Sequence, residues 1–226
     1  MARPKITRAN SAGEGTRLAL LAIAERLFAE RGISGVSLRE IGREAMQGNN
    51  NVVQYHFGSK ENLVSQIFHW RVGQMEQARL RMIEQAERKG QLLNCRTIVD
   101  IWCLPVLGLV AEDGNHPYAH FLAHYLARYR PAGIQHVGDV SPNEFPSLTK
   151  LGECLNRAVS HLPPRLRSQR IELAFQIFLS SIVAHDLRRG CEEEPLLDLE
   201  DVLELVATVL CQRAGGPSGA QVTAVE

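Results

Sequence analysis

The 226-residue sequence lacks the features that mark membrane proteins and disulfide-rich proteins. No uncharged apolar run approaches the roughly 20 residues that a membrane span needs, and Pro105 interrupts the most apolar stretch, residues 101–111. The five cysteines are scattered and include no C-x-x-C pair, which argues against a zinc ribbon or a disulfide framework. We therefore expect a cytoplasmic protein that has no membrane partner and whose thiols are reduced and mostly buried.

Common catalytic motifs are also missing. The chain contains no G-x-S-x-G, no H-E-x-x-H and no glycine-rich phosphate loop, so we predict no catalytic residue, no metal and no cofactor. His116, His120 and His124 recur at the four-residue spacing at which histidines on a helix ligate divalent metals. His116 precedes Pro117, which favours a helix cap over a helical ligand. A helical metal-dependent enzyme using His120 and His124 remains an alternative function, and either ring could instead contact a bound ligand.

The formal net charge of the chain is zero, but its charged residues are unevenly distributed. Residues 1–60 contain nine Lys or Arg and five Glu, a balance of +4, whereas residues 61–226 contain sixteen basic and twenty acidic residues, a balance of −4. A basic end on a neutral chain is typical of nucleic-acid binding. It argues against a helical adaptor that binds only proteins. Arg3, Lys5 and Arg8 could form an arm near the minor groove or an inert tail.

Apolar residues recur with the period of helices, and no alternating strand pattern is present. Thr16 is placed to cap the first helix, Gly32 to stop it, and Ser37 and Glu40 have the spacing of a capping box. The predicted fold is all-α: an N-terminal three-helix helix-turn-helix domain at 1–60, whose residues 1–15 form a flexible arm, a larger helical ligand-binding and dimerisation domain at 61–213, and a disordered tail at 214–226. The predicted helices span 16–31, 37–45, 49–57, 60–88, 92–111, 117–129, 146–162, 165–189 and 198–213.

The segment 47–57, Q-G-N-N-N-V-V-Q-Y-H-F, decides how the first domain is interpreted. At 100° per residue, Val53 and Phe57 face one way and Asn51 and Tyr55 face the other, with Gln54 and Val52 on the flanks. A short helix after a tight turn and a helix of about nine residues is helix-turn-helix architecture, whose second helix enters the major groove.

The outward side chains of this segment suit DNA chemically. Asparagine and glutamine pair with adenine, valine packs on the thymine methyl group, and tyrosine reaches phosphate. Asn49 or Asn50 could cap the helix, whose N-terminus then favours phosphate. The alternative is a polar loop followed by an ordinary amphipathic helix.

Three blocks of the first 70 residues resemble the DNA-binding domain of the TetR family of bacterial transcriptional repressors. They are A-E-R-L-F-A-E-R-G at 24–32, V-S-L-R-E-I at 36–41 and Y-H-F-G-S-K-E-N-L at 55–63. The resemblance implies phosphate contacts at Ser37 and Lys60 and places His56 on the recognition helix. Two departures are a turn one residue longer than usual and Gln54 in place of an aromatic residue. The full set of predicted DNA-binding residues is Ser37, Arg39, Asn49, Asn50, Asn51, Val52, Gln54, Tyr55, His56 and Lys60.

The resemblance further implies a homodimer that a small, largely apolar effector releases from a palindromic double-stranded DNA operator; an activator is the alternative. Apolar and ring side chains of the second domain are the predicted effector pocket: Trp102, Leu104, Leu107, Phe121, His124, Tyr125, Leu155 and Phe178. Segment 171–184 is apolar almost all round, which indicates a partner surface, and the family dimerises through its last two long helices. The predicted dimer residues are Ile171, Phe175, Phe178, Ile182, Val202, Val206 and Val209, some of which must serve the protomer's own core.

Overall fold

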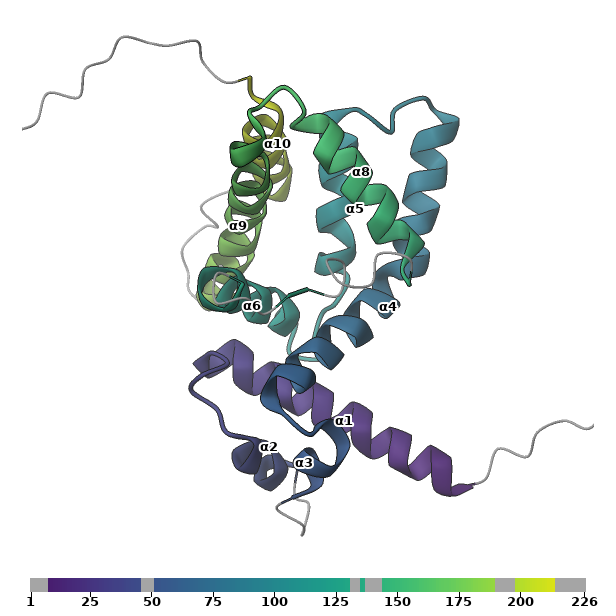
Figure 1. Ribbon diagram of the computed structural model, residues 1–226. Coiled ribbons are helices and arrows are strands. Elements are labelled where there is room, and N and C mark those ends of the chain that lie inside the picture. Colours follow the sequence, from purple (N-terminus) through teal and green to yellow (C-terminus); the bar gives the residue numbers. More distant parts are fainter. Residues whose placement is uncertain (1–7, 46–50, 131–134, 137–143, 190–197, 214–226) are drawn as a thin grey trace, which may run out of the picture.

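The computed structural model of the protein describes residues 8–45, 51–130, 135–136, 144–189 and 198–213 (Figure 1). Within these ranges every regular element is a helix, so the all-α prediction is confirmed. None of the described helices is long and apolar enough to cross a membrane. The predicted tail at 214–226 lies outside the described residues.

Three helices form the N-terminal unit: α1 (Arg8–Arg31), α2 (Leu38–Glu44) and α3 (Val52–Phe57). Their apolar faces meet around Phe28, Ile41 and Val53, none of which has exposed surface. The prediction of a flexible arm over 1–15 is wrong from Arg8 onward, because α1 begins there and not at Thr16. Once a helix has nucleated, each further residue adds a hydrogen bond at little cost, so α1 continues upstream of its core-facing part.

The larger unit begins with α4 (Lys60–Arg88), which runs out of the N-terminal unit and packs on α5 (Cys95–Leu107) and α8 (Pro146–Ala158) (Figure 1). Helix α8 also packs on α5, and α10 (Leu199–Cys211) packs on α5 and on α9 (Pro164–Arg188). The other described elements of this unit are α6 (Pro117–His124) and the π-helical turn η1 (Tyr125–Tyr129).

Local signals in the sequence set several helix ends as predicted. The Ser37 hydroxyl accepts from the Glu40 amide, and the Glu40 carboxylate accepts from the Ser37 amide at 2.7 Å, which completes the capping box. These hydrogen bonds hold the pKa of Glu40 below its usual value. Ser59 caps α4 through the Asn62 amide, and Gly32, with φ of +73°, ends α1 in a conformation that favours glycine.

The helix predicted over 117–129 changes type partway. It is α-helical to His124 and then continues as the π turn η1, in which the Arg130 amide donates to the Tyr125 carbonyl at 3.0 Å. A π turn holds extra backbone relative to an α turn, so the side chains after His124 are rotated out of the α-helical register. Periodicity at 100° per residue therefore predicts their direction incorrectly.

Helix α1 is held against α4 by a buried ion pair. Arg71 of α4 donates through Nε and Nη2 to the two carboxylate oxygens of Glu25 of α1, at 2.6 and 2.5 Å. Glu25 is only 1% exposed, and burial raises its pKa while Arg71 opposes that shift. Arg71 also lies over the Trp70 ring, 4.0 Å from its centroid. The pair thus fixes where the N-terminal unit sits on α4.

The cysteines correct one expectation. Cys95 at the start of α5 and Cys211 at the end of α10 form a disulfide across 116 positions of sequence, so the prediction of reduced thiols is wrong for these two. Cys103 and Cys154 are free and buried, as expected, and Cys191 lies outside the described residues. The sequence gives no sign of the bond because only the packing of α5 on α10 brings the two ends together.

Candidate nucleic-acid interface and ligand cavity

Helix α3 presents the two faces that its sequence predicts. Val53 and Phe57 are buried against α1, α2 and α4, whereas Tyr55 is 84% exposed and Asn51 and Gln54 face solvent. Val52 is half-buried at the edge of the core. The helix is shorter than the predicted 49–57, because it begins at Val52 with Asn51 at the N-cap position. Asn49 and Asn50 lie outside the described residues.

The end of α3 is closed by side chains of its own surroundings. The Gln54 amide donates to the Gly58 carbonyl, and the Asn62 amide donates to the Phe57 carbonyl at 2.8 Å. Gly58 has φ of +70° and lets the chain turn sharply into α4. Gln54 therefore needs only to exchange one local hydrogen bond to reach a base edge.

Candidate phosphate contacts surround this helix. The Ser37 hydroxyl accepts in its capping bond, so its own proton is left to donate to an anion. Lys60 reaches the Ile33 carbonyl with Nζ at 3.1 Å, and Arg39 is exposed on α2. The His56 ring is half-buried and meets the Tyr55 ring edge to face, with centroids 5.3 Å apart. Cationic and hydroxyl groups thus lie at the starts or on the surfaces of α2 and α4, the two helices next to the amide- and phenol-bearing α3, and such groups suit contacts to DNA phosphates.

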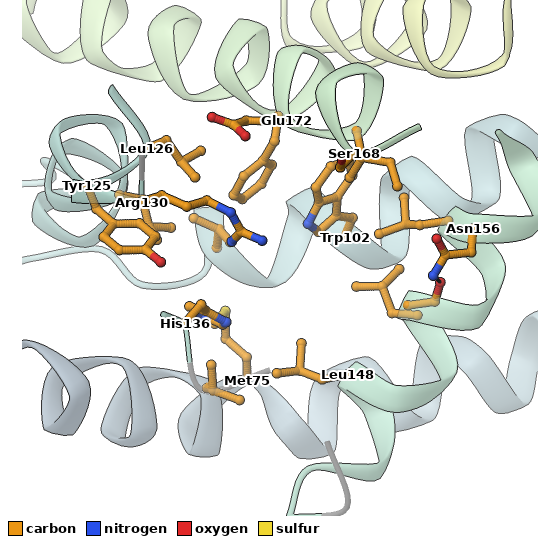
Figure 2. A pocket seen from close by; sticks show the side chains of 18 of the residues that line it. Met75, Trp102, Tyr125, Leu126, Arg130, His136, Leu148, Asn156, Ser168 and Glu172 are labelled. Carbon is orange, nitrogen blue, oxygen red and sulfur yellow. Dashed lines mark hydrogen bonds between the residues drawn. The ribbon is translucent and has the colours of Figure 1, made fainter. Parts of the chain in front are cut away.

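A cavity of about 610 Å³ lies among α4, α5, α6, η1, α8 and α9 (Figure 2). Its volume is in the range of sites for small organic ligands. The Trp102 and Phe175 rings are stacked at one wall, with centroids 4.5 Å apart and planes 10° apart. The lining residues are Val72, Met75, Arg79, Trp102, Val106, Tyr118, Leu122, Tyr125, Leu126, Arg130, His136, Leu148, Leu151, Gly152, Leu155, Asn156, Pro164, Arg167, Ser168, Ile171, Glu172 and Phe175.

Three of the predicted pocket residues line this cavity: Trp102, Tyr125 and Leu155. Phe121 and Phe178 do not, because they are fully buried in ring clusters of the core. Leu104 and Leu107 pack on the core away from the cavity, and the exposed His124 lies beside Gly32 of the N-terminal unit. Sequence reasoning missed the lining residues of α4, of which Arg79 is the most unusual: it is a buried arginine on an otherwise apolar stripe.

Two of the three spaced histidines meet a buried carboxylate. Asp186 of α9 accepts from the His116 amide at 2.7 Å, and its oxygens lie 3.0 Å from His116 Nδ1 and 3.1 Å from His120 Nε2. His185 Nδ1 is 3.3 Å away. Within the ranges that the structure describes, no group of three His, Cys, Asp or Glu side chains is arranged to hold a metal ion. The cluster joins α6 to α9.

We predict that Asp186→Asn destabilises the protein by about 1–3 kcal/mol at neutral pH, because the half-buried His116 and His120 lose a charged acceptor. Burial raises the pKa of Asp186, but the His116 hydrogen bonds outweigh it, so the pKa lies below its usual value. Its contribution to stability is therefore present above about pH 4 and is lost as the pH falls through the lowered pKa. Urea unfolding at pH 7 and pH 3 tests this, with the exposed Asp201→Asn as control. Equal losses for both variants would contradict the role of Asp186.

Most of the predicted dimer residues lie in the core of the single chain or line the cavity. Phe178, Ile182, Val202 and Val206 are buried inside the single chain, and Ile171 and Phe175 line the cavity. Of the seven predicted dimer residues, Val209 alone is partly exposed and does not line the cavity. Instead, α9 exposes a stripe at seven-residue spacing, formed by Leu166, Leu173, Ser180 and Leu187. Segment 171–184 is thus not buried on every side within one chain.

Comparison with known proteins bears on the candidate nucleic-acid interface around α3. Residues 20–67 match the family model described as bacterial regulatory proteins of the tetR family. The match begins inside α1, contains all of α2 and α3, and ends inside α4. No curated protein sequence matches the chain.

Proposed function

Because the chain is a DNA-binding transcriptional regulator of the TetR family, we propose that it is a repressor that binds a palindromic operator as a homodimer. A small effector bound in the 610 Å³ cavity releases it. The observation that supports this most strongly is that two of the helices that line the cavity, α4 and α6, also contact α1.

The contacts from cavity to DNA-binding unit are specific. On one side, Val72, Met75 and Arg79 line the cavity on the same helix whose Arg71 holds Glu25 of α1. On the other side, Tyr118 and Leu122 line it from α6, which packs along α1 (Figure 1). A ligand that moves either wall therefore changes the position of α1, and α2 and α3 move with it.

An effector acts in this scheme only if it binds the DNA-incompetent arrangement more tightly than the DNA-bound one. The coupling is then reciprocal, so operator DNA must weaken effector binding by the same factor. This is a quantitative requirement that titrations of either ligand in the presence of the other can check.

Dimerisation is part of the proposal because α3 is too short to supply typical specific affinity alone. Two copies related by a two-fold axis read two half-sites, and the operator is then near-palindromic. The exposed stripe of Leu166, Leu173, Ser180 and Leu187 on α9 supports a dimer surface on this helix. Leu205 is also exposed, on α10, which packs on α9.

Selection of bound sites from random duplex DNA is the experiment that tests the proposal. A near-palindromic consensus supports a dimeric regulator, and reporter expression from that sequence separates repression from activation. Recovery of sequences no more related than the starting pool would sink the proposed function.

The base-reading face is tested by substitution. We expect Asn51→Ala or Gln54→Ala to cost about 1–3 kcal/mol on the selected site and to relax the preference at one position of each half-site. Lys60→Ala should instead weaken all duplexes alike and flatten the dependence of affinity on salt. Fluorescence anisotropy on selected and scrambled duplexes measures both, with Lys150→Ala of α8 as a control. If both α3 variants bind the selected site like wild type, the face is wrongly assigned.

A further inference from the structure

One wall of the cavity contains a buried cation. Arg79 of α4 is 2% exposed and lines the cavity, in line with Val72, Met75, Ile83 and Ala86 on the buried face of the helix. Charged side chains are almost never this buried unless they are paired, because transferring an ion out of water is strongly unfavourable. Its surroundings should therefore reveal a partner.

The contacts of Arg79 within the described residues are long and include no carboxylate. Its Nε lies 3.4 Å from the Ile101 carbonyl, Nη1 lies 3.5 Å from Ser147 Oγ, and Nη2 lies 3.6 Å from Met75 Sδ. Good hydrogen bonds to oxygen are closer to about 2.9 Å, so these are weak. The nearby Glu76 carboxylate is itself used by Ser147, accepting from its amide at 2.9 Å and its hydroxyl at 2.5 Å.

The guanidinium cannot relieve this cost by losing its proton. Burial lowers the pKa of Arg79, and Tyr118 and Glu76 oppose that shift. Arginine nevertheless stays protonated in proteins because its starting pKa is so high. A charge that remains buried and weakly bonded beside a cavity is a binding group for an anion that enters the cavity.

The other charged groups around the cavity also favour a negatively charged ligand. Among the described lining residues, Arg79, Arg130 and Arg167 are basic and Glu172 is acidic. Figure 2 shows the Arg130 guanidinium directed into the space between Trp102 and His136. Arg167 is held by the carbonyls of Leu162 and Ser160.

The apolar part of the cavity defines the remainder of the ligand. The Trp102 and Phe175 rings are stacked on each other and both line the cavity, and Met75 and Leu148 lie across the cavity from Trp102 (Figure 2). Apolar groups gain buried area, and aromatic groups also gain ring contacts, against such a ring pair. The lining thus combines an aromatic wall with a buried cation.

We propose that the cavity binds an amphipathic organic anion whose carboxylate or sulfonate pairs with Arg79 while its apolar body packs against the Trp102–Phe175 ring pair. This inference rests on the proposed function for the ligand's role as effector, and it refines the effector from a largely apolar molecule to an anionic one. The binding itself is independent of DNA.

Two fluorescent probes with the same skeleton test the proposal directly. 1-Anilinonaphthalene-8-sulfonate carries a negative charge, and N-phenyl-1-naphthylamine does not. We expect wild-type protein to bind the sulfonate saturably and more tightly than the neutral probe. Arg79→Met should weaken the sulfonate about ten- to a hundredfold, the range of a charged hydrogen bond, and change the neutral probe less than about threefold. Arg81→Met, an exposed arginine on the same helix, should change neither.

The outcomes separate the possibilities. No saturable binding of the sulfonate, tighter binding of the neutral probe by wild type, or equal weakening of both probes in Arg79→Met would overturn the proposal. Arg79→Lys keeps the charge and should keep the preference for the sulfonate over the neutral probe. If Arg79→Met does not fold, the two probes are compared on Arg79→Lys and wild type, and loss of the preference in Arg79→Lys contradicts the proposal. Operator release is measured separately: a site that binds the anion without releasing DNA contradicts its effector role, whereas failure to bind any duplex contradicts the proposed function alone.

Discussion

Arg71→Met is expected to lower the free energy of unfolding by about 3–5 kcal/mol, because it leaves the Glu25 carboxylate buried without its ion-pair partner. Glu25 is 1% exposed, and both of its oxygens are bonded by Arg71. Urea unfolding at fixed protein concentration measures the loss. The pair also joins the two units, so the variant should lose operator affinity even at temperatures where it remains folded.

The dependence on pH distinguishes this cause from lost packing. An acid whose pKa is raised in the folded state contributes most favourably below its unfolded value of about 4.3, and that contribution falls as the pH rises through the folded pKa. Arg71→Met removes the opposing cation, so its deficit should be largest at neutral pH and smaller near pH 5.

Two further variants give the controls for Arg71. The double variant Glu25→Gln, Arg71→Met removes both charges and should recover most of the loss. Arg26→Met breaks the exposed pairs with Glu30 and Glu44 next to Glu25 and should cost no more than about 1 kcal/mol. A deficit in Arg71→Met that is independent of pH would contradict the buried-charge explanation.

The double variant Leu173→Glu, Leu187→Glu is expected to be a folded monomer that binds the operator about a thousandfold or more weakly, since typical specific binding exceeds non-specific binding by at least that factor. Leu173 and Leu187 are 49% and 74% exposed on the α9 stripe, so carboxylates there are solvated in the single chain. In a dimer the same carboxylates would be buried opposite their own copies, which is strongly unfavourable. Sedimentation velocity and anisotropy on the selected duplex measure the two effects.

Controls for the dimer prediction come from other leucines and from the core. Leu93→Glu places the same charge at a half-exposed leucine before α5, away from α9, and should leave mass and DNA binding unchanged. Phe178→Glu should unfold the protomer, because Phe178 has no exposed surface. A wild-type protein that is monomeric at micromolar concentration and binds one non-palindromic half-site would overturn the assembly.

Local sequence signals predicted the N-terminal unit well. The capping box at Ser37 and the stop at Gly32 each depend on residues within a few positions, so they can be found without knowing the fold. The faces of α3 followed from periodicity, since Val53 and Phe57 pack under the helix whichever neighbours supply the core. The predicted start of α1 at Thr16 was wrong because this helix begins at Arg8, by propagation and not at a cap that the sequence marks.

The cavity could be predicted only in part. Apolar ring residues are equally suited to a core and to a pocket, and the structure places Phe121 in the former and Trp102 in the latter. The sequence does mark Arg79 as unusual, because it interrupts the apolar stripe of α4 formed by its buried neighbours four and seven residues away, Val72, Met75, Ile83 and Ala86. The position of Arg130 depends on the π turn η1, which no residue pattern predicts.

The proposed dimer surface could not be located from periodicity. A helix that is apolar all round has two candidate faces, and periodicity does not say which one the protomer uses for itself. Tertiary packing places Phe178 and Ile182 inward and leaves Leu173 and Leu187 outward. The assignment therefore required the positions of α5, α6 and α10 around α9.

The disulfide between Cys95 and Cys211 divides the chain topologically into a closed loop and an open arm. The loop contains every described wall of the cavity except the one that α4 provides, and the arm contains α1, α2, α3 and α4. All five cysteines lie between positions 95 and 211, so no disulfide can tie the arm to the loop. A ligand that pairs with Arg79 and packs against Trp102 would thus span the joint between these two parts, and it could rotate the arm without straining any covalent link in the loop.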